Sequence, residues 1–488
     1  MCGLIRTFQP IHKLNRVKMR WPQDSKSVFT TPRNLILLDG PFQKQRGLVY
    51  SDMMSTKTPF ILHVWMLATR CFALPLALLS WIFHSRMGAD PKRFPERLGH
   101  GALPDADPVI WFHAASLGEV MQIAPLAQYL AQTEKSKILV TTTTDTGANW
   151  VAREMPNAIH RFVPIDTPLV VERFLNGWSI SAAIFVEGDL WPRLLAGLKE
   201  RHVPQILLNA RHSRTRARFP AVFAALLAPF SCVTCRSEAI AEGMIALGLP
   251  SDRVHVLPDL RLTLPKLTAP HAVIAPLSRA IGTRPVWLAA STHPADEEVV
   301  LAAHQDVLAA CPDALLILAP RHPNRGLPLH RLANARGFTT ARRSLGEDIS
   351  ASTQIYIADT LGELGVFFTL SPLAFIGGSC GQEGGHNPYE PASFETALVY
   401  GPNVKNFIDA YAALRSAGAA VQVENPSDLG DALVGLIRGD RTLAIAQAGL
   451  CFMEETQNCT VSYADLISGV LRHTEGLRKA SIETSQRR

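Results

Sequence analysis

The sequence predicts an α/β protein with two Rossmann-like halves, each a parallel β-sheet with helices on both faces. Three observations predict this class. Short apolar runs of strand length alternate with segments of helical spacing, which is the order expected for a parallel sheet. A proline-rich segment at residues 262–276 interrupts the alternation and reads as a linker, after which the pattern restarts. The 488 residues, of which 47% are hydrophobic and 18% charged, suffice for two or three globular domains.

Residues 60–83 form an apolar segment of about the length of a membrane helix. His63 and Arg70 interrupt it, and Trp65 and Trp81 lie near its ends, as is typical of membrane interfaces. We expect a membrane-anchor helix within residues 53–88 that either spans the bilayer or lies in one leaflet. A buried core helix is the alternative.

The basic extension at residues 1–52 conflicts with a spanning anchor, because positive flanks stay in the cytoplasm and would place the rest of the chain outside. Our hypothesis is that the natural chain starts at Met53 or Met54. The basic residues after the anchor would then hold the following domains on the cytoplasmic side.

The predicted strands fall into two groups. Those of the first half, residues 89–265, are Val109–His113, Ile138–Thr144, Ala182–Val186, Gln205–Asn209 and Cys232–Thr234. Those of the second half, residues 266–450, are Val286–Ala290, Ala314–Ala319, Gln354–Ile357, Leu373–Ile376, Ala397–Tyr400 and Ala420–Val423. A C-terminal helix and polar tail occupy residues 451–488. Sheets of this kind bind ligands at the carboxyl ends of their strands.

Cysteine usage and charge restrict the class of protein. The cysteines are scattered, which indicates reduced thiols facing the cytosol. Cys232 and Cys235 are close, but no second pair follows, so we interpret them as small residues of a buried strand and not as zinc ligands. The net charge of +6 fits an anionic substrate or a membrane surface and is too small to indicate nucleic acid.

Two acidic turns follow strands of the first half. Glu119 could take a proton from a substrate hydroxyl, or it could be an ordinary first-turn glutamate that interacts with the helix dipole. Glu187 and Asp189 flank Gly188, and the alternative there is that Asp189 caps the next helix. The segment that follows the next strand contains Arg211, Arg214, Arg216 and Arg218. These arginines could bind an anionic headgroup, or form a solvated turn.

Two polar segments follow strands of the second half. Arg321 and His322 suit a phosphate or a carboxylate, against a plain polar turn. The glycine-rich segments at 377–379 and 384–391 let the backbone approach a ligand. If a helix starts early there, His386 and Glu390 share a helical face, and Glu390 could hold ribose hydroxyls. The P-loop and GxGxxG motifs are absent from the sequence, which excludes a P-loop ATPase and weakens a nicotinamide interpretation.

Together these motifs resemble those of the 3-deoxy-D-manno-octulosonic acid (Kdo) transferases of lipopolysaccharide synthesis. The likeness covers about residues 60–450. The matching segments are HAASLGE (113–119), EGDLWP (187–192), NARHS (209–213), ASTHPADEE (290–298), LAPRHPNR (318–325), DTLGELG (359–365), FIGGS (375–379), GGHNPYEP (384–391) and GPNVKNF (401–407).

The resemblance implies a GT-B fold with an N-terminal membrane-anchor helix, an acceptor half and a donor half. It implies inverting transfer of Kdo from CMP-Kdo to a lipid A precursor, with the catalytic domains on the cytoplasmic face of the inner membrane. Glu119 matches the general base and Glu187 a second carboxylate of the same cleft. We expect no cofactor and no essential divalent ion, because the donor carries a single phosphate.

The resemblance also places the binding residues. The expected CMP-Kdo site consists of Arg321, His322, Gly362, Glu363, Leu364, Gly378, Ser379, Asn387 and Glu390. The expected acceptor or anionic-lipid side consists of Ser116, Arg211, Arg214 and Arg216. Three segments depart from the family pattern: Asp189 replaces a glutamate, residues 258–261 keep only a positive charge, and Glu383 adds an acid beside the donor loop.

Two other functions remain open. One is another GT-B enzyme, such as a hexosyltransferase using a UDP-sugar or a sugar-nucleotide epimerase. The other is a non-catalytic membrane-bound module that holds an anionic lipid through residues 211–218. Inhibition by CMP but not UDP would separate a Kdo transferase from the first, and turnover would separate it from the second.

Overall fold

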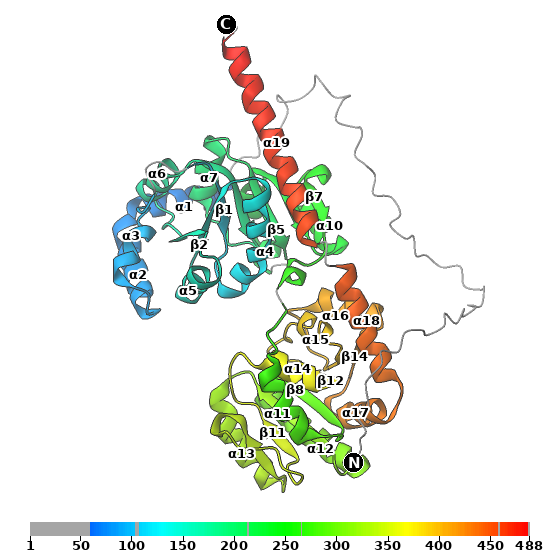
Figure 1. The fold of residues 1–488 in the computed structure, drawn as a ribbon. Helices are drawn as coiled ribbons and strands as arrows, with labels where there is room; N and C mark the ends of the chain where they lie inside the picture. The colour runs from blue at the N-terminus through cyan, green and yellow to red at the C-terminus, as the bar shows by residue number, and fades with distance from the viewer. Residues whose placement is uncertain (1–58, 103–106, 212–213, 265, 457–458, 487–488) are drawn as a thin grey trace, which may run out of the picture. The chain divides into compact units, whose positions relative to one another are not determined.

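The computed structural model describes residues 59–102, 107–211, 214–264, 266–456 and 459–486 (Figure 1). The basic extension at residues 1–52 and the hypothetical start at Met53 or Met54 lie outside these residues. Two seven-stranded parallel sheets, with helices between their strands, account for most of the described chain.

The first sheet has the strand order β3-β2-β1-β4-β5-β6-β7, with every neighbouring pair parallel. Its strands are β1 (Val109–His113), β2 (Lys137–Thr142), β3 (Ile159–Phe162), β4 (Ile180–Val186), β5 (Gln205–Ala210), β6 (Phe230–Cys235) and β7 (Val254–Val256). The helices that accompany it are α4 (Leu117–Thr133), α5 (Asp145–Glu154), α6 (Pro168–Gly177), α7 (Pro192–Glu200), α8 (Arg214–Arg218), α9 (Pro220–Leu227) and α10 (Glu238–Ala246). Alternate residues of β1 enter two different apolar clusters, Trp111 one and Phe112 the other, so both faces of the sheet are covered.

The second sheet has the order β10-β11-β9-β8-β12-β13-β14 and is also parallel. Its strands are β8 (Val286–Thr292), β9 (Leu315–Pro320), β10 (Thr340–Arg342), β11 (Ile355–Ile357), β12 (Leu373–Ile376), β13 (Ala397–Tyr400) and β14 (Ala420–Gln422). Its helices are α11 (His271–Ile281), α12 (Pro294–Ala310), α13 (Gly326–Ala335), α14 (Leu364–Leu370), α15 (Tyr389–Ala392), α16 (Ile408–Ser416), α17 (Leu429–Arg438) and α18 (Arg441–Glu455). Two apolar clusters again cover the two faces.

Each sheet has one point where the strand order reverses direction. In the first sheet this point lies between β1 and β4, and in the second between β8 and β12. Open parallel sheets bind ligands outside the carboxyl ends of the strands at such points. The turns after β1, β4, β8 and β12 are therefore the places to look for a site.

The predicted parallel α/β class is confirmed, but three strands were missed. They are β3, β7 and β10, and each forms an edge of its sheet. Edge strands bury less apolar surface and so carry polar side chains, here His160 and Arg161 in β3 and Arg342 in β10. The apolar runs used for prediction were absent there for that reason. The predicted domain boundaries stay predictions.

The proline-rich linker predicted at residues 262–276 is wrong in its second part. Helix α11 already begins at His271 and contains Pro276. Proline leaves one backbone carbonyl without an intrahelical donor, which biases a sequence-based assignment against a helix.

The predicted anchor is two helices and not one. Helix α1 (Phe60–Cys71) and helix α2 (Ala73–Arg86) meet at Phe72 with a bend of 81°. Pro75 explains the break, because it has no N–H to donate to the carbonyl of Cys71 and its ring crowds the preceding turn. Most apolar side chains of both helices are exposed, including Phe60 (82%) and Leu74 (84%), so the core-helix alternative is wrong.

Length and apolar composition decide whether a helix could cross a membrane. In the described part of the chain, no single helix is both long enough and apolar enough to do so. The bent pair of α1 and α2 meets both conditions when its two members are taken together.

Helix α19 (Cys459–Gln486) follows the second half but packs on the first. Tyr463, fully buried, donates its hydroxyl hydrogen to the carbonyl of Pro258 at 3.0 Å. Tyr463 and Ile467 lie in the same apolar cluster as Val120 and Ile123 of α4. The chain therefore returns to its first sheet after completing the second.

Candidate active site

The turn between β1 and α4 holds Glu119 in a defined position. Ser116 caps α4 and its Oγ accepts from the Glu119 N–H at 3.4 Å. The Glu119 carboxylate accepts from the Ala115 N–H at 2.8 Å and from the Ser116 hydroxyl at 3.2 Å. Glu119 thus serves as the first-turn capping acid, as the structural alternative expected, and also stands at the switch point of the sheet. The hydroxyl of Ser116, predicted on the acceptor side, is used within this cap.

The turn after β4 is strained. Glu187 has φ of +57° and Gly188 has φ of +141°, conformations that L side chains rarely adopt. Arg216 donates to the Glu187 carbonyl at 2.9 Å and fills the space over Gly188, where a Cβ would lie 2.2 Å from its guanidinium. This backbone geometry aims the Glu187 side chain towards α4.

Glu119 and Glu187 form an electrostatically coupled pair. Gln122 of α4 donates to Glu187 Oε1 at 3.4 Å, and Arg211 pairs with Glu187 Oε2 at 3.1 Å. Burial raises the pKa of Glu119 above its ordinary value, and the charge of Glu187 raises it further, against hydrogen bonds from Ala115 and Ser116. Glu119 therefore binds a proton more readily than an exposed glutamate, as a general base must.

The expected alternative for Asp189, capping of α7, is wrong. Helix α7 begins at Pro192 and its N-cap residue is Trp191. Asp189 instead lies 3.1 Å from Nε2 of His113, a buried residue at the end of β1. Trp111 donates to the hydroxyl oxygen of Thr141 at 2.9 Å, and that hydroxyl lies 2.9 Å from His113 Nδ1. In a neutral imidazole this order makes Nε2 the donor to Asp189.

A buried polar network supports the carboxylate pair, and the sequence did not reveal it. Asn209, which has φ of +54°, donates to Gln122 Oε1 at 3.3 Å and to Asp259 Oδ1 at 3.2 Å. Asp259 in turn pairs with Arg261 at 3.1 Å. Asn209 lies in a matched motif, but its partners come from α4 and from the segment after β7, which only the fold brings to it. Asp259 and Arg261 belong to the segment that departs from the family pattern, and here they make an ion pair.

The arginines of residues 211–218 do not act as one cationic patch. Arg211 is exposed and reaches Glu187. Arg216 is only 5% exposed and binds the carbonyls of Arg211 and Glu187. Its guanidinium is thus engaged in the turn around Glu187, and its role as a headgroup ligand stays a prediction. Arg214 begins α8, and its side chain lies outside the described part.

In the second half, Asp296 of helix α12 links that helix to the glycine-rich turn through hydrogen bonds. This fully buried carboxylate accepts from the backbone N–H groups of His293 at 2.9 Å, Gly378 at 2.7 Å and Cys380 at 3.0 Å. Gly378 has φ of +69°, and a Cβ there would lie 3.0 Å from the His386 ring. Asp296 was not predicted as a site residue. Its place three residues after His293 in a capping box was the available signal.

Three histidines meet beside this turn. The Nε2 atoms of His293 and His386 are 2.9 Å apart, and the two rings are stacked. His322 packs edge-on against His293. Burial and the nearby charge of Arg321 lower the pKa of His386 to about 4. Arg321 and His322 thus lie close to His386.

His386 and Glu390 do not share a helical face, because α15 begins only at Tyr389. Glu390 instead accepts from the Asn387 amide at 3.3 Å. Burial raises the pKa of Glu390, while Asn387 and Arg321 act in the opposite direction. Asn387, Glu390 and Arg321 therefore form one polar group.

The remaining predicted donor residues have structural partners. Glu363 makes a two-pronged ion pair with Arg343 at 2.6 and 3.0 Å, which lowers the pKa of Glu363. Gly362 has φ of +82°, and Leu364 starts α14. Ser379 is fully buried, donates to the Ile376 carbonyl at 2.6 Å and accepts from Gly401 N–H at 2.9 Å. The Ser379 side chain is thus engaged within the turn, and the role of Ser379 in binding CMP-Kdo stays a prediction.

Within the described residues, no group of three His, Cys, Asp or Glu side chains is arranged to hold a metal ion. Cys232 and Cys235 lie inside strand β6, where burial raises their pKa values to about 12 and about 11. This confirms the interpretation of the pair as residues of a buried strand.

The sequence of this chain is similar to those of known proteins of one enzyme family. A family model described as 3-deoxy-D-manno-octulosonic-acid transferase (kdotransferase) matches residues 92–264. The 3-deoxy-D-manno-octulosonic acid transferase of Rickettsia typhi is 32% identical over 376 residues, covering 75% of this chain and 80% of the relative.

Two solved structures are also similar. The C-terminal CMP-Kdo binding domain of WaaA from Acinetobacter baumannii is 31% identical, covering 36% of this chain and 94% of that domain, with a TM-score of 0.35. A glycosyltransferase from Rickettsia africae is 10% identical, covering 76% of this chain and 99% of its own, with a TM-score of 0.51. The second likeness is one of fold alone, and with the two parallel sheets it confirms the predicted GT-B arrangement.

Proposed function

The chain belongs to the 3-deoxy-D-manno-octulosonic acid transferase family, and from this premise we propose that it transfers Kdo from CMP-Kdo to a lipid A precursor, such as lipid IVA, with inversion. The observation that carries the proposal is the half-buried pair of Glu119 and Glu187 at the switch point of the first sheet. A carboxylate of raised pKa at that place suits removal of a proton from an acceptor hydroxyl.

The acceptor half supplies the base. The acceptor hydroxyl gives its proton to Glu119, and its oxygen forms the new bond to the anomeric carbon of Kdo. Glu187 keeps the pKa of Glu119 raised and is itself held by Gln122 and Arg211. General-base catalysis of this kind contributes about 10²–10⁴-fold.

The donor half stabilises the leaving group. The bond between the anomeric carbon and the phosphate oxygen breaks, and CMP departs with the electron pair. Arg321 and His322 would bind the phosphate, since a guanidinium and an imidazole suit its charge. Attack from the face opposite the phosphate gives inversion. We expect neither a cofactor nor an essential divalent ion, because CMP leaves with a single phosphate.

We place the protein at the inner membrane, with both catalytic halves on the cytoplasmic face. The exposed apolar side chains of α1 and α2 support the membrane location. Trp65 of α1 donates to Asp166 at 2.7 Å, and Arg193 of α7 binds Thr69 at 2.6 Å, so α1 lies against the first half. A helix held in this way favours insertion into one leaflet. The small net charge gives no reason to expect a nucleic-acid partner.

The test is release of CMP from CMP-Kdo by the purified, detergent-solubilised protein in EDTA, with and without a tetraacylated lipid A precursor. We expect lipid-dependent release that falls about 10²–10⁴-fold in Glu119→Gln. Inhibition by CMP but not by UDP separates this function from a transferase or epimerase that uses a UDP-sugar. No release by folded wild type would overturn the proposal.

A further inference from the structure

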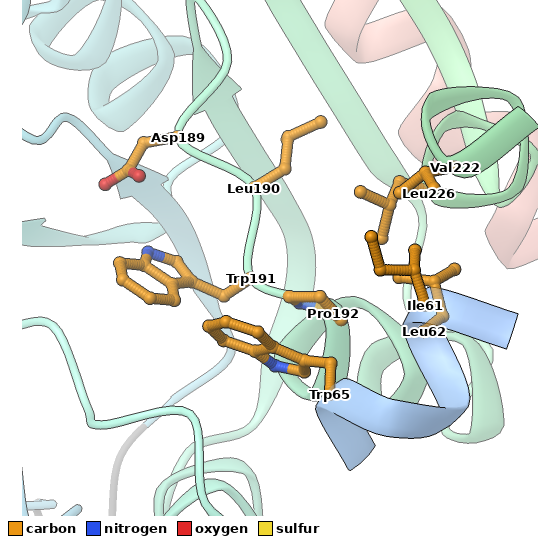
Figure 2. A pocket seen from close by; sticks show the side chains of 9 residues that line it. All are labelled: Ile61, Leu62, Trp65, Asp189, Leu190, Trp191, Pro192, Val222 and Leu226. Carbon is orange, nitrogen blue, oxygen red and sulfur yellow. The ribbon is translucent and has the colours of Figure 1, made fainter. Parts of the chain in front are cut away.

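An apolar pocket lies between helix α1 and the turn that follows Glu187. Its volume is about 250 Å³. Figure 2 shows Val222 and Leu226 of α9 facing Ile61 and Leu62 of α1, with Asp189 at the other end. The complete lining is Ile61, Leu62, Trp65, Asp189, Leu190, Trp191, Pro192, Val222 and Leu226. Apart from one carboxylate, these side chains offer an almost wholly apolar surface.

Buried polar contacts keep this pocket open in a fixed shape. Asp166, only 3% exposed, accepts from Trp65 Nε1 at 2.7 Å and from the backbone N–H groups of Arg193 and Leu194 at 3.1 and 3.0 Å. Arg193 also binds the carbonyl of Met66 and the hydroxyl of Thr69. Helix α1 is therefore tied to the start of α7, and the pocket between them is already formed before a ligand enters.

One end of the pocket leads towards the carboxylate pair. Leu190, Trp191 and Pro192 directly follow the Glu187–Asp189 turn. Asp189, the only acid in the lining, is bound to His113, which ends the strand that precedes Glu119. The apolar pocket thus shares Asp189 with the candidate active site and adjoins the turn that carries Glu187.

The other wall of the pocket belongs to α1, which also carries exposed apolar side chains. Phe60, Val64 and Leu67 of α1 are exposed, at 82%, 44% and 64%. The helix that forms one wall of the pocket therefore also presents apolar side chains to its surroundings. An apolar pocket beside such a helix and next to the turn that carries Glu187 fits an alkyl chain.

We propose that this pocket binds one acyl chain of the acceptor lipid and so aligns the acceptor hydroxyl with Glu119. The inference rests on the proposed function, because it takes the acceptor to be an acylated sugar. It adds a subsite on the acceptor half that selects by chain length, since methylene groups beyond the pocket's capacity gain no buried surface.

The first test fills the pocket. Leu226→Phe and Val222→Phe each place an aromatic ring in the pocket lining, and Val222 is the more exposed of the two residues. The matched control is Leu169→Phe, because Leu169 lies on the surface of α6 and is 72% exposed. The readout is the ratio of kcat/KM for a tetraacylated acceptor to that for its deacylated sugar. We expect a fall of about tenfold in both pocket variants, the effect of excluding about two methylene groups, and no change in Leu169→Phe. An unchanged ratio in two folded pocket variants would overturn the proposal.

The second test reports binding without turnover. A tetraacylated lipid A precursor with a diazirine near the end of one acyl chain is photolysed with the full-length protein in detergent, and adducts are located by peptide mass spectrometry. Adducts within residues 61–65, 190–192 or 222–226 support the subsite, and adducts confined to α2 overturn it. If the pocket is labelled but CMP-Kdo is never consumed, the proposed function fails while the subsite stands.

Discussion

Burial and the charge of Glu187 both raise the pKa of Glu119, and the pH dependence of activity follows from this. The charge of Glu187 raises the pKa of Glu119, so removing that charge lowers it. A base works only above its pKa, and the acid limb of kcat/KM must move with that pKa. In Glu187→Gln we expect this limb at lower pH than in wild type, whatever happens to the maximal rate. Glu187→Asp, which keeps the charge, is the control. A limb that stays in place in Glu187→Gln would show that Glu119 is not the titrating base.

Arg216 acts on stability through the backbone of Glu187. Its guanidinium is the donor to a carbonyl in a strained turn, and the side chain is buried. Arg216→Met removes this donor and leaves the carbonyl of Glu187 unsatisfied, so we expect a loss of about 1–3 kcal/mol in the free energy of unfolding. Arg218→Met, in the same helix but exposed, should stay within about 0.5 kcal/mol. Urea denaturation of both variants makes the comparison. Equal losses would contradict the positioning role.

For single residues, the sequence was enough to identify candidate acidic and basic side chains of the site, but not their hydrogen-bond and ion-pair partners. Glu119, Glu187 and Arg321 stand out because each follows an apolar strand. The bond between His113 and Asp189 could not be predicted, because it requires β1 and β4 to be neighbours in register. The burial of Arg216 and Ser379 could not be predicted either, because a polar residue in a turn looks the same in a sequence whether it binds a ligand or a carbonyl.

Among the elements, the edge strand β10 depends on ion pairs. Its last residue, Arg342, binds Asp359 at 2.7 and 3.1 Å, and Ser344 donates to the same carboxylate. Burial by itself would raise the pKa of Asp359, but the hydrogen bonds from Ser344 and Arg342 outweigh it and lower that pKa. These contacts join β10 and the turn after it to the end of β11.

Low pH should therefore destabilise the folded structure around β10 and β11. A carboxylate whose pKa is lower in the folded state stabilises the fold above its unfolded pKa, and that stability is lost as the pH falls through the folded pKa. Asp359 and Glu363 both belong to this class. We expect Asp359→Asn to be less stable than wild type at pH 7 and to lose less further stability between about pH 5 and pH 3. Urea melts at a series of pH values test this. Parallel stability curves would contradict it.

Every strand that lies inside one of the two sheets was predicted, whereas three of the four edge strands were missed. Val109–His113 and Leu373–Ile376 were placed to the residue because both faces of these strands are covered and all their side chains are buried. The bend between α1 and α2 was missed although Pro75 was visible, because the apolar composition on both sides suggested one continuous segment.

For the whole molecule, the return of α19 to the first sheet is the feature that no local pattern predicts. The chain leaves the second sheet at α18 and then buries Tyr463 and Ile467 against α4. The helix that carries Glu119 in its first turn is thus covered by the last helix of the chain. A change in the C-terminal helix should therefore affect the half of the protein that is furthest from it in the sequence.

Tyr463→Ala tests this connection. The side chain is fully buried and its hydroxyl binds the Pro258 carbonyl, so truncation leaves a cavity and removes that hydrogen bond. We expect a loss of about 3–5 kcal/mol, the usual effect of removing a buried aromatic ring. Val461→Ala, two residues earlier in the same helix and 38% exposed, is the control and should change stability by less than about 1 kcal/mol. Hydrogen exchange then locates the effect, with faster exchange expected in α4 and in residues 258–263, while β8 and β12 keep their protection. Loss of protection confined to α18 and the second sheet would show that α19 does not stabilise the first half.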